Sequence, residues 1–204
     1  MTKAIFFDIG GVLIDLDFEA CLRAFREIMG FERIGEILNP YKQRGIFGDM
    51  EGGRVSADEF RRAILAESRE VAVPEDVDRC LEHFLTGMDP KKAPLLKDLS
   101  KRYPLFTLSN NNPISMGLSR KLFAENGLEW EEIFTDNFIS CDMKLEKPGA
   151  EIYAEAIRRS GFEAKDILYI DDATANVEAG IKAGLRSVLY VAGEDLAALI
   201  EANL

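Results

Sequence analysis

Residues 4–11 read AIFFDIGG, an apolar run that ends on an aspartate and two glycines. Ala4 to Phe7 is apolar on both faces, which is typical of a strand buried in a parallel sheet. The pair Gly10-Gly11 predicts a turn directly after that strand. An aspartate at such a strand end lies at the edge where open α/β sheets bind their ligands. This stretch therefore predicts a buried first strand and makes Asp8 a candidate site residue.

The sequence that follows has the spacing of helices. Apolar side chains within residues 18–29 recur at intervals of four, three and four residues, which predicts an amphipathic helix. Ser56 followed by Glu59 fits a capping box that opens another helix, and Pro74 begins a third. We expect helices and no strand between about residues 17 and 87.

Beyond residue 90 the pattern changes to strand and helix in alternation. Buried strands are expected at residues 104–109, 137–141, 166–170 and 186–191. This alternation predicts an α/β fold, a doubly wound parallel sheet with helices on both faces. The first strand precedes the helical block and the others follow it. We therefore expect one Rossmann-like core, residues 1–16 and 88–204, with residues 17–87 inserted as helices.

Composition narrows the classes of function. The 204 residues include 25 Lys+Arg and 36 Asp+Glu, so the net charge is −11 and no basic run attracts nucleic acid or an anionic membrane. No apolar run approaches the roughly 18 residues of a membrane span. Three cysteines without a CxxC pair support neither a disulfide framework nor a zinc ribbon, and they fit a cytoplasmic protein. With only one histidine, His83, carboxylates are expected to carry the chemistry.

Polar side chains follow the predicted strands at the points where they end. These groups are Asp8, Ser109-Asn110 and Asp171-Asp172, and Lys147-Pro148 opens a nearby helix. The carboxyl ends of parallel strands share one edge of a sheet, so these groups are expected to converge. Three clustered carboxylates raise one another's pKa unless a cation joins them, and hard oxygen ligands suit Mg²⁺. The sequence therefore predicts a magnesium site at this edge.

Each group taken alone also has a structural explanation. Asp8 before two glycines is ordinary turn chemistry, and the other strand-end polar residues are good helix caps. Lys147 before proline fits an exposed surface lysine. Their joint order at the ends of successive buried elements is what favours a functional site.

Over nearly its whole length the chain resembles the haloacid dehalogenase superfamily of hydrolases. KLEKPGAEIY, residues 144–153, and YIDDATANVEAG, residues 169–180, match patterns of that family. The resemblance implies that the helical block is the family's helical cap. DIGGVLIDLDF followed by LSNNN looks most like bacterial sugar-phosphate phosphatases, including those acting on α-D-glucose 1-phosphate.

The resemblance also implies an activity and a set of roles. The protein is expected to be a phosphatase that hydrolyses a small phosphorylated metabolite, a sugar phosphate, through an aspartyl-phosphate on Asp8 with Mg²⁺ as cofactor. The phosphoryl group would be bound by Gly10, Gly11, Ser109, Asn110 and Lys147. The metal would be held by Asp8, the Gly10 carbonyl, Asp171 and Asp172, with Asn176 as the trailing polar residue of the last motif.

One position departs from the family pattern. Phosphatases of this superfamily usually have a second aspartate two residues after the nucleophile, which acts as general acid and base, and here that position is Gly10. A positive φ at Gly10 would make an aspartate there strained. Asp15 and Asp17 are nearby replacements and are equally well explained as exposed acids at the start of the cap, and His83 is a further candidate.

Two other classes of function remain as alternatives. A hydrolytic 2-haloacid dehalogenase uses the same aspartate on carbon and also lacks the second one, but it needs no magnesium, so Asp171-Asp172 argues against it. A phospholigand-binding protein that has lost the acid has no need of a carboxylate nucleophile facing an anion. Specificity is expected to lie in the cap loop YKQRGIFGDMEGGR, through Arg44, Phe47 and Arg54.

Overall fold

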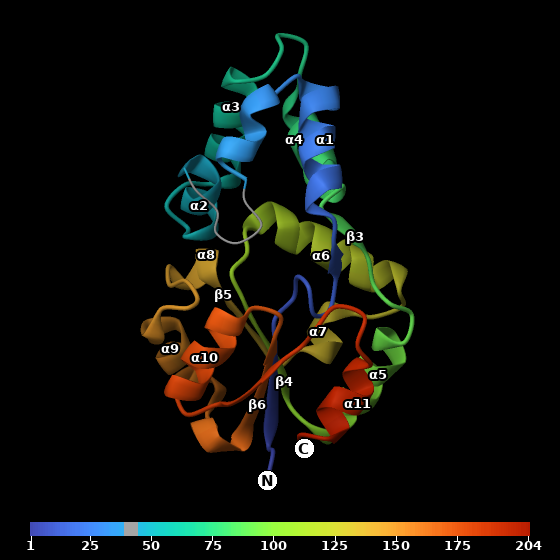
Figure 1. The fold of residues 1–204 in the computed structure, drawn as a ribbon, viewed down its shortest axis with the longest axis vertical. Coiled ribbons are helices and arrows are strands. Elements are labelled where there is room, and N and C mark those ends of the chain that lie inside the picture. Colours follow the sequence, from blue (N-terminus) through green and yellow to red (C-terminus); the bar gives the residue numbers. More distant parts are fainter. Residues whose placement is uncertain (39–44) are drawn as a thin grey trace.

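The computed structural model describes residues 1–38 and 45–204, and its centre is a five-stranded parallel sheet (Figure 1). The strands are β1 (Ala4–Phe7), β4 (Leu105–Ser109), β5 (Asp136–Ile139), β6 (Ile167–Asp171) and β7 (Arg186–Leu189). Their spatial order is β5-β4-β1-β6-β7. The chain thus adds strands outward on one side of β1 and then returns to add two on the other side. The predicted doubly wound α/β fold is confirmed.

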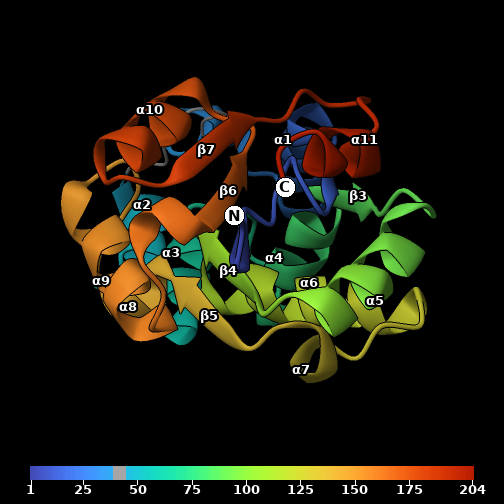
Figure 2. The same cartoon turned by 90° about the horizontal axis from the view of Figure 1, so that it is seen from below.

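Helices cover both faces of this sheet (Figure 2). One face carries α5 (Lys92–Arg102), α6 (Pro113–Glu125), α7 (Trp130–Ile133) and α11 (Leu196–Glu201). The other carries α8 (Ser140–Met143), α9 (Ala150–Ser160) and α10 (Thr174–Lys182), with the 3-10 turn η2 (Ala164–Asp166) before β6. Strand β1 is buried because its alternate residues enter different cores. Ile5 and Phe7 pack with the first group of helices, and Ala4 and Phe6 pack toward α9.

The remaining helices form a lobe beyond the carboxyl ends of the strands (Figure 1). They are α1 (Phe18–Met29), the 3-10 turn η1 (Glu32–Glu36), α2 (Gly45–Glu51), α3 (Ala57–Ala66) and α4 (Pro74–Glu82). Their buried side chains form an apolar cluster, which Ile114 and Leu118 of α6 also join, and in it the rings of Phe47 and Phe60 meet edge to face at 5.1 Å. Helix α3 starts at the expected capping box of Ser56 and Glu59.

A two-stranded ribbon lies where the chain enters and leaves this helical lobe. Strands β2 (Asp15–Leu16) and β3 (Leu85–Gly87) pair antiparallel, although no strand was expected between about residues 17 and 87 and none at Asp15–Leu16. Two or three residues are too few to show an alternating pattern, so only the long-range pairing defines them. Strand β5 also ends earlier than expected, because Ser140 begins the short helix α8.

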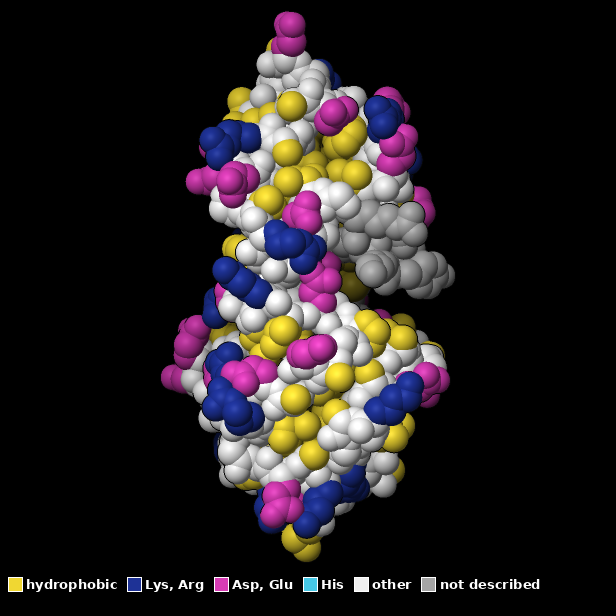
Figure 3. Space-filling view, turned by 90° about the vertical axis from the view of Figure 1, so that its left-hand side faces the viewer, with side chains coloured by type: hydrophobic (Ala, Val, Ile, Leu, Met, Phe, Trp, Pro, Cys, Tyr) yellow, Lys and Arg dark blue, Asp and Glu magenta, His cyan; other side chains and the backbone are white. Residues whose placement is uncertain are grey.

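The charged side chains on the surface show no concentration of positive charge on the face drawn in Figure 3. Side chains of both charge signs are interspersed over the face in Figure 3, with no large basic patch there. Among the helices of residues 1–38 and 45–204, none is long and apolar enough to cross a membrane.

Candidate active site

Strand register brings the predicted site residues to one edge of the sheet. Phe7 of β1 pairs with Thr107 of β4 and with Ile170 of β6, so the residues that follow them lie in a row. The Asp8 amide continues this pairing by donating to the Ile170 carbonyl at 2.9 Å. The carboxyl ends of these parallel strands therefore place Asp8 beside Asp171.

Lys147 lies between these two carboxylates. Its Nζ is 2.9 Å from Asp8 Oδ2 and 2.6 Å from Asp171 Oδ2, and it donates to the Leu108 carbonyl at 2.9 Å. An ammonium has three protons, so every donor of Lys147 has an acceptor. Burial opposes the charge, but Asp171 and Asp8 together hold the pKa of Lys147 above its usual value. Lys147 is therefore a fixed positive charge on the site floor.

Asp171 is held by donors on all sides. Besides Lys147, it accepts hydrogen bonds from the Tyr169 hydroxyl, the Ala173 amide at 2.8 Å and Asn176 Nδ2 at 3.0 Å. Burial acts against ionisation, but Lys147 and these donors lower the pKa of Asp171 below its ordinary value. Tyr169 was not expected from the sequence. Its position two residues before Asp171 on the same strand, and so on the same face, is the signal that identifies it.

Asp8 and Asp172 are in a different electrostatic situation. Burial raises the pKa of Asp8 to about 7, although Lys147 acts in the opposite direction. Burial also raises the pKa of Asp172, and the neighbouring charge of Asp171 adds to that effect. Clustered carboxylates that resist ionisation are stabilised by a bound cation.

The residues present fit a divalent cation with oxygen ligands. Asp8, Asp171 and Asp172 each offer a carboxylate oxygen, and these oxygens lie within 4.8 Å of one another. The Gly10 carbonyl accepts no hydrogen bond from any described residue. Gly11 has φ 76°, and a Cβ there would lie 2.0 Å from Asp172 Oδ2. Glycine at position 11 therefore makes room for Asp172, and the ligand set suits Mg²⁺.

Donors for an anion lie beside these carboxylates. Ser109 lines the cavity described below, and its hydroxyl forms no hydrogen bond within residues 1–38 and 45–204. The amides of Gly10 and Asn110 are likewise without a partner in that part of the chain. Asn112, rather than Ser109 or Asn110, caps helix α6, so the two earlier residues are left for another role.

Two of the expected phosphate-binding residues have other partners. The Gly11 amide donates to the Ile14 carbonyl at 2.8 Å, so it closes the turn and does not face a ligand. The Asn110 side chain pairs with the backbone of Lys147, donating at 2.9 Å and accepting at 2.8 Å. Asn110 thus positions Lys147, and only its amide is left for a phosphoryl oxygen.

A cavity of about 640 Å³ opens between the sheet edge and the helical lobe. Its acidic lining residues are Asp8, Glu51, Glu146 and Asp172. Of the expected specificity residues, Arg54 lines it but is ion-paired with Asp49 at 2.8 Å and Glu146 at 3.0 Å. Phe47 also lines it, yet is only 1% exposed. Arg44 lies outside the described residues.

The position of the absent second aspartate is also defined. Gly10 does not have a positive φ, contrary to one explanation for its glycine, and a Cβ there would lie 3.0 Å from Leu16 Cδ1. Asp15 pairs with Lys92 at 3.1 Å, and Asp17 caps α1 by accepting from the Ala20 amide at 2.8 Å. Both replacements suggested by the sequence therefore have structural roles. His83 ends helix α4 and does not line the cavity.

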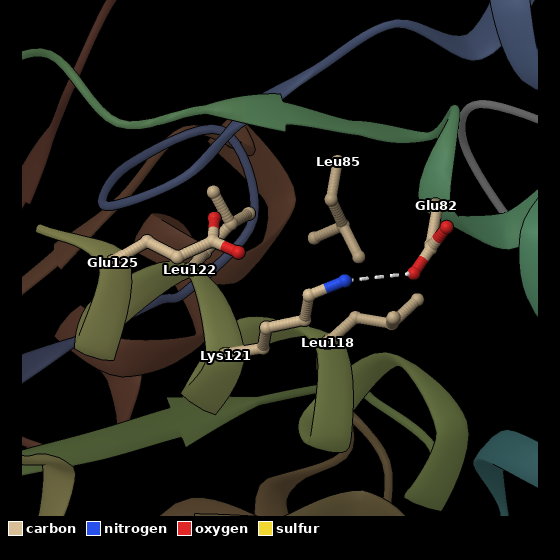
Figure 4. A pocket seen from close by; sticks show the side chains of 6 residues that line it. All are labelled: Glu82, Leu85, Leu118, Lys121, Leu122 and Glu125. Carbon is tan, nitrogen blue, oxygen red and sulfur yellow. Dashed lines mark hydrogen bonds and ion pairs between the residues drawn. The ribbon is translucent and has the colours of Figure 1, made fainter.

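A smaller hollow of about 140 Å³ lies between α6 and the β3 end of the helical lobe (Figure 4). Leu85, Leu118 and Leu122 line it, and Lys121 reaches across it to Glu82 at 3.2 Å. It is lined by none of the strand-end residues, so it is a contact between helical lobe and core and no part of the site.

Known proteins share this architecture. A model of the haloacid dehalogenase-like hydrolase family matches residues 2–184. The chain is 29% identical over 196 residues to the D-ribitol-5-phosphate phosphatase of Bacteroides thetaiotaomicron, covering 96% of this chain and 95% of that one.

Two solved structures resemble the whole chain. A wild-type haloacid dehalogenase-family enzyme of Bacteroides thetaiotaomicron, in complex with magnesium and inorganic phosphate, superposes with a TM-score of 0.90 at 31% identity, over 98% of this chain and 99% of that one. A predicted hydrolase of the same kind from Porphyromonas gingivalis gives 0.89 at 33% identity, over 99% and 97%. The resemblance expected from the motifs is confirmed, and the chain belongs to the haloacid dehalogenase-like hydrolase family.

Proposed function

We propose that this protein is a magnesium-dependent phosphatase that hydrolyses a small phosphomonoester through an aspartyl-phosphate on Asp8. The observation that carries the proposal is the position of the Asp8 carboxylate. It lies 2.9 Å from the Lys147 ammonium, within the three-aspartate cluster, at the floor of the large cavity. The relative named as a phosphatase, and the related structure that holds magnesium and phosphate, support the same reaction.

The residues of the site have the chemistry that two displacement steps require. Asp8 attacks phosphorus, and the ester oxygen leaves. Lys147, the Ser109 hydroxyl and the amides of Gly10 and Asn110 bind the phosphoryl oxygens, which carry the developing charge. Water then attacks phosphorus and releases phosphate and the free Asp8 carboxylate.

Magnesium would be held by Asp8, Asp172 and the Gly10 carbonyl, with Asp171 bound directly or through water. When bound, the cation offsets the repulsion between the Asp8 carboxylate and an anionic phosphate. Asp171 has a second task, because its hydrogen bonds fix the orientation of Lys147.

We further propose that residues 1–16 and 88–204 form the catalytic core and residues 17–87 the cap. An apolar cluster that comes mostly from the helical lobe supports this division. The cavity lies between the two parts, so the cap residues that line it would contact the non-reacting part of the substrate.

The substrate class we propose is a phosphorylated sugar or polyol. Polar side chains line the cavity beyond the strand-end groups, including Glu51, Arg54 and Glu146, and such groups suit hydroxyls. The relative named for D-ribitol 5-phosphate supports this class. The glucose 1-phosphate type of substrate indicated by the motifs belongs to it as well.

A phosphate-release screen tests the proposal. Ribitol 5-phosphate, glucose 1-phosphate, glycerol phosphate and p-nitrophenyl phosphate are compared in Mg²⁺ and in EDTA, and chloride release from 2-chloropropionate is followed in parallel. We expect magnesium-dependent phosphate release and no chloride. Chloride release that resists EDTA would instead identify a dehalogenase.

A further inference from the structure

The phosphatase proposed above lacks the usual proton donor two residues after its nucleophile. An alkoxide leaving group needs a proton, and general acid help is worth typically 10²- to 10⁴-fold in rate. The Leu16 side chain occupies the space beside Gly10, 3.0 Å from where a Cβ would be. A proton donor for this reaction must therefore come from another element.

Elimination among the acids that line the cavity leaves one candidate. Asp8 and Asp172 belong to the nucleophile and metal cluster. Glu146 is ion-paired with Arg54 at 3.0 Å. Glu51, at the end of α2, lines the same cavity, and its carboxylate forms no hydrogen bond or ion pair with any described residue. We propose that Glu51, supplied by the helical lobe, is the general acid and base that replaces the aspartate absent at position 10.

The main chain of Glu51 is attached to the site floor. The hydroxyl of buried Ser140, in α8, lies 2.7 Å from the Glu51 carbonyl and accepts a hydrogen bond from the Asn111 amide at 2.9 Å. Asn111 follows Ser109-Asn110 at the end of β4. One serine thus links the end of α2 to the strand end that carries the phosphate-binding donors, which holds Glu51 against the catalytic floor.

The next residues of the helical lobe strengthen this contact. Gly53 has φ 64°, and a Cβ there would lie 2.1 Å from the Cys141 carbonyl. Arg54 bridges the segment to Glu146. The loop after α2 therefore rests directly on the core, and Glu51 does not depend on a distant cap for its position.

The surroundings favour a carboxyl that holds its proton. Burial raises the pKa of Glu51 to about 8, with the charges of Glu146 and Asp8 adding to the effect and Lys147 acting against it. A pKa near the working pH is what an acid that also serves as a base requires.

The proton balance of the two steps is complete. As Asp8 bonds to phosphorus and the ester P–O bond breaks, the Glu51 proton passes to the leaving oxygen. Glu51 carboxylate then takes a proton from the water whose oxygen attacks phosphorus. Inorganic phosphate leaves, and the Asp8 carboxylate and protonated Glu51 are restored.

The test compares two esters in wild type, Glu51→Gln and the matched control Glu146→Gln. One ester is the alkyl phosphate that wild type hydrolyses best, and the other is p-nitrophenyl phosphate, whose phenolate leaves without a proton. Because kcat/KM covers only the steps through phosphorylation, the second step does not enter it. Circular dichroism and magnesium titration establish that each variant is folded and binds the metal.

We expect Glu51→Gln to lower kcat/KM by about 10²- to 10⁴-fold on the alkyl ester and by less than about tenfold on p-nitrophenyl phosphate. The same variant should release a burst of p-nitrophenolate equal to the enzyme concentration, since its second step lacks a base. Glu146→Gln keeps an oxygen that accepts from Arg54, so the loop stays in place and both esters should be affected alike. Glu51→Asp, which keeps the acid on a shorter chain, should lie between wild type and Glu51→Gln on the alkyl ester.

The outcomes separate this proposal from the function on which it rests. Equal losses on the two esters, or no loss, would overturn the role of Glu51 and leave the phosphatase intact. A wild type that hydrolyses p-nitrophenyl phosphate but no alkyl phosphate would also contradict it, because no acid would then be at work. A wild type inactive on both esters with Mg²⁺ would refute the phosphatase and, with it, this proposal.

Discussion

Lys147 shows how much a single side chain contributes to this site. Its ammonium has three acceptors, the Asp8 and Asp171 carboxylates and the Leu108 carbonyl, and its side chain is 1% exposed. Two buried carboxylates so close together would otherwise repel each other. Within the described residues Asp8 accepts from the Ile9 amide and Lys147, whereas Asp171 also accepts from Tyr169, Ala173 and Asn176, so Asp8 is the less constrained of the two carboxylates.

Asp8→Asn should abolish turnover while the protein stays folded. The amide is nearly isosteric with the carboxylate but cannot attack phosphorus. The measurements are phosphate release and thermal unfolding. Retention of more than a small fraction of wild-type phosphate release would remove the aspartyl-phosphate mechanism.

Gly10→Asp combined with Leu16→Ala should restore alkyl ester hydrolysis to the Glu51→Gln variant. Gly10 has no positive φ, so the obstacle to a side chain is the Leu16 methyl at 3.0 Å rather than backbone strain. The expected gain in the alkyl-to-aryl ratio of kcat/KM is at least about tenfold, because a general acid is returned. Leu16→Ala in the same background is the control, and an equal gain there would mean that the new aspartate does not donate a proton.

Among the elements, the end of α2 and the short helix α8 form the contact on which the cavity depends. Ser140 reaches the carbonyl of Glu51, and the glycine at position 53 allows the loop to approach Cys141 closely. Asp15 and Lys92 make a second contact, 3.1 Å apart, between β2 and α5. The helical lobe is thus attached to the core at its loop and at its two-stranded connection.

Gly53→Ala should weaken the docking of this loop. An alanine at φ 64° is strained, and its Cβ would lie 2.1 Å from the Cys141 carbonyl. The strain alone costs roughly 1–2 kcal/mol, so the melting temperature should fall by at least about 2 °C. Hydrolysis of the alkyl ester should fall more than that of p-nitrophenyl phosphate, because Glu51 is displaced.

Gly117→Ala is the matched control for that change. Gly117 lies within α6, and a Cβ there would meet nothing within 4 Å. Alanine is the better helix former by about 0.5–1 kcal/mol, so this variant should be more stable. If Gly53→Ala behaves like Gly117→Ala, the loop contact does not hold Glu51.

At the scale of the whole molecule, the site brings carboxylates that repel one another close together, and a bound cation would reduce that repulsion. A chain of net charge −11 gathers three aspartates at one sheet edge and lines the cavity with Glu51 and Glu146 as well. A cation that binds only the folded protein stabilises it by mass action. Metal content and pH should therefore change stability as well as activity.

Magnesium should raise the melting temperature by several degrees at saturating concentration, and EDTA should reverse the rise. Asp172→Asn should reduce the shift strongly, because it removes the negative charge from one of the clustered carboxylates. Differential scanning calorimetry measures the effect without any substrate. A shift that survives in Asp172→Asn would place the metal elsewhere.

Glu51→Gln should stabilise the protein, and more so at high pH. Burial raises the pKa of Glu51 from 4.5 to about 8, so the folded state binds the proton more tightly than the unfolded state. The stability from that proton is fully present below the unfolded value and is lost as the pH rises through the folded value. Gln carries no charge at any pH, so the gain in melting temperature should grow from about pH 5 to about pH 9. A gain that is the same at both pH values would contradict the raised pKa.

Local sequence patterns were sufficient to predict the parallel sheet. They were also sufficient to predict that Asp8, Lys147 and the Asp171-Asp172 pair lie close together. Continuous apolar runs in the sequence predict buried strands. A polar residue directly after such a run must lie at the end of the strand. The same local view assigned Asp15 and Asp17 as possible acids and Gly11 as a phosphate donor, because it considers only neighbours along the chain. In the folded protein each has a partner of its own.

Only the tertiary structure brings Ser140 into contact with Glu51 and pairs strand β2 with β3. Ser140 and Glu51 are 89 residues apart, and the paired residues Asp15 and Gly87 of β2 and β3 are also far apart in the sequence, so no local pattern relates the members of either pair. The environment of Glu51 is of the same kind. In the sequence Glu51 is an ordinary glutamate. The pKa of its carboxyl is raised because folding buries this group near Glu146 and Asp8. Burial and charge proximity are properties of the packed chain, whereas strand periodicity is a property of neighbouring residues.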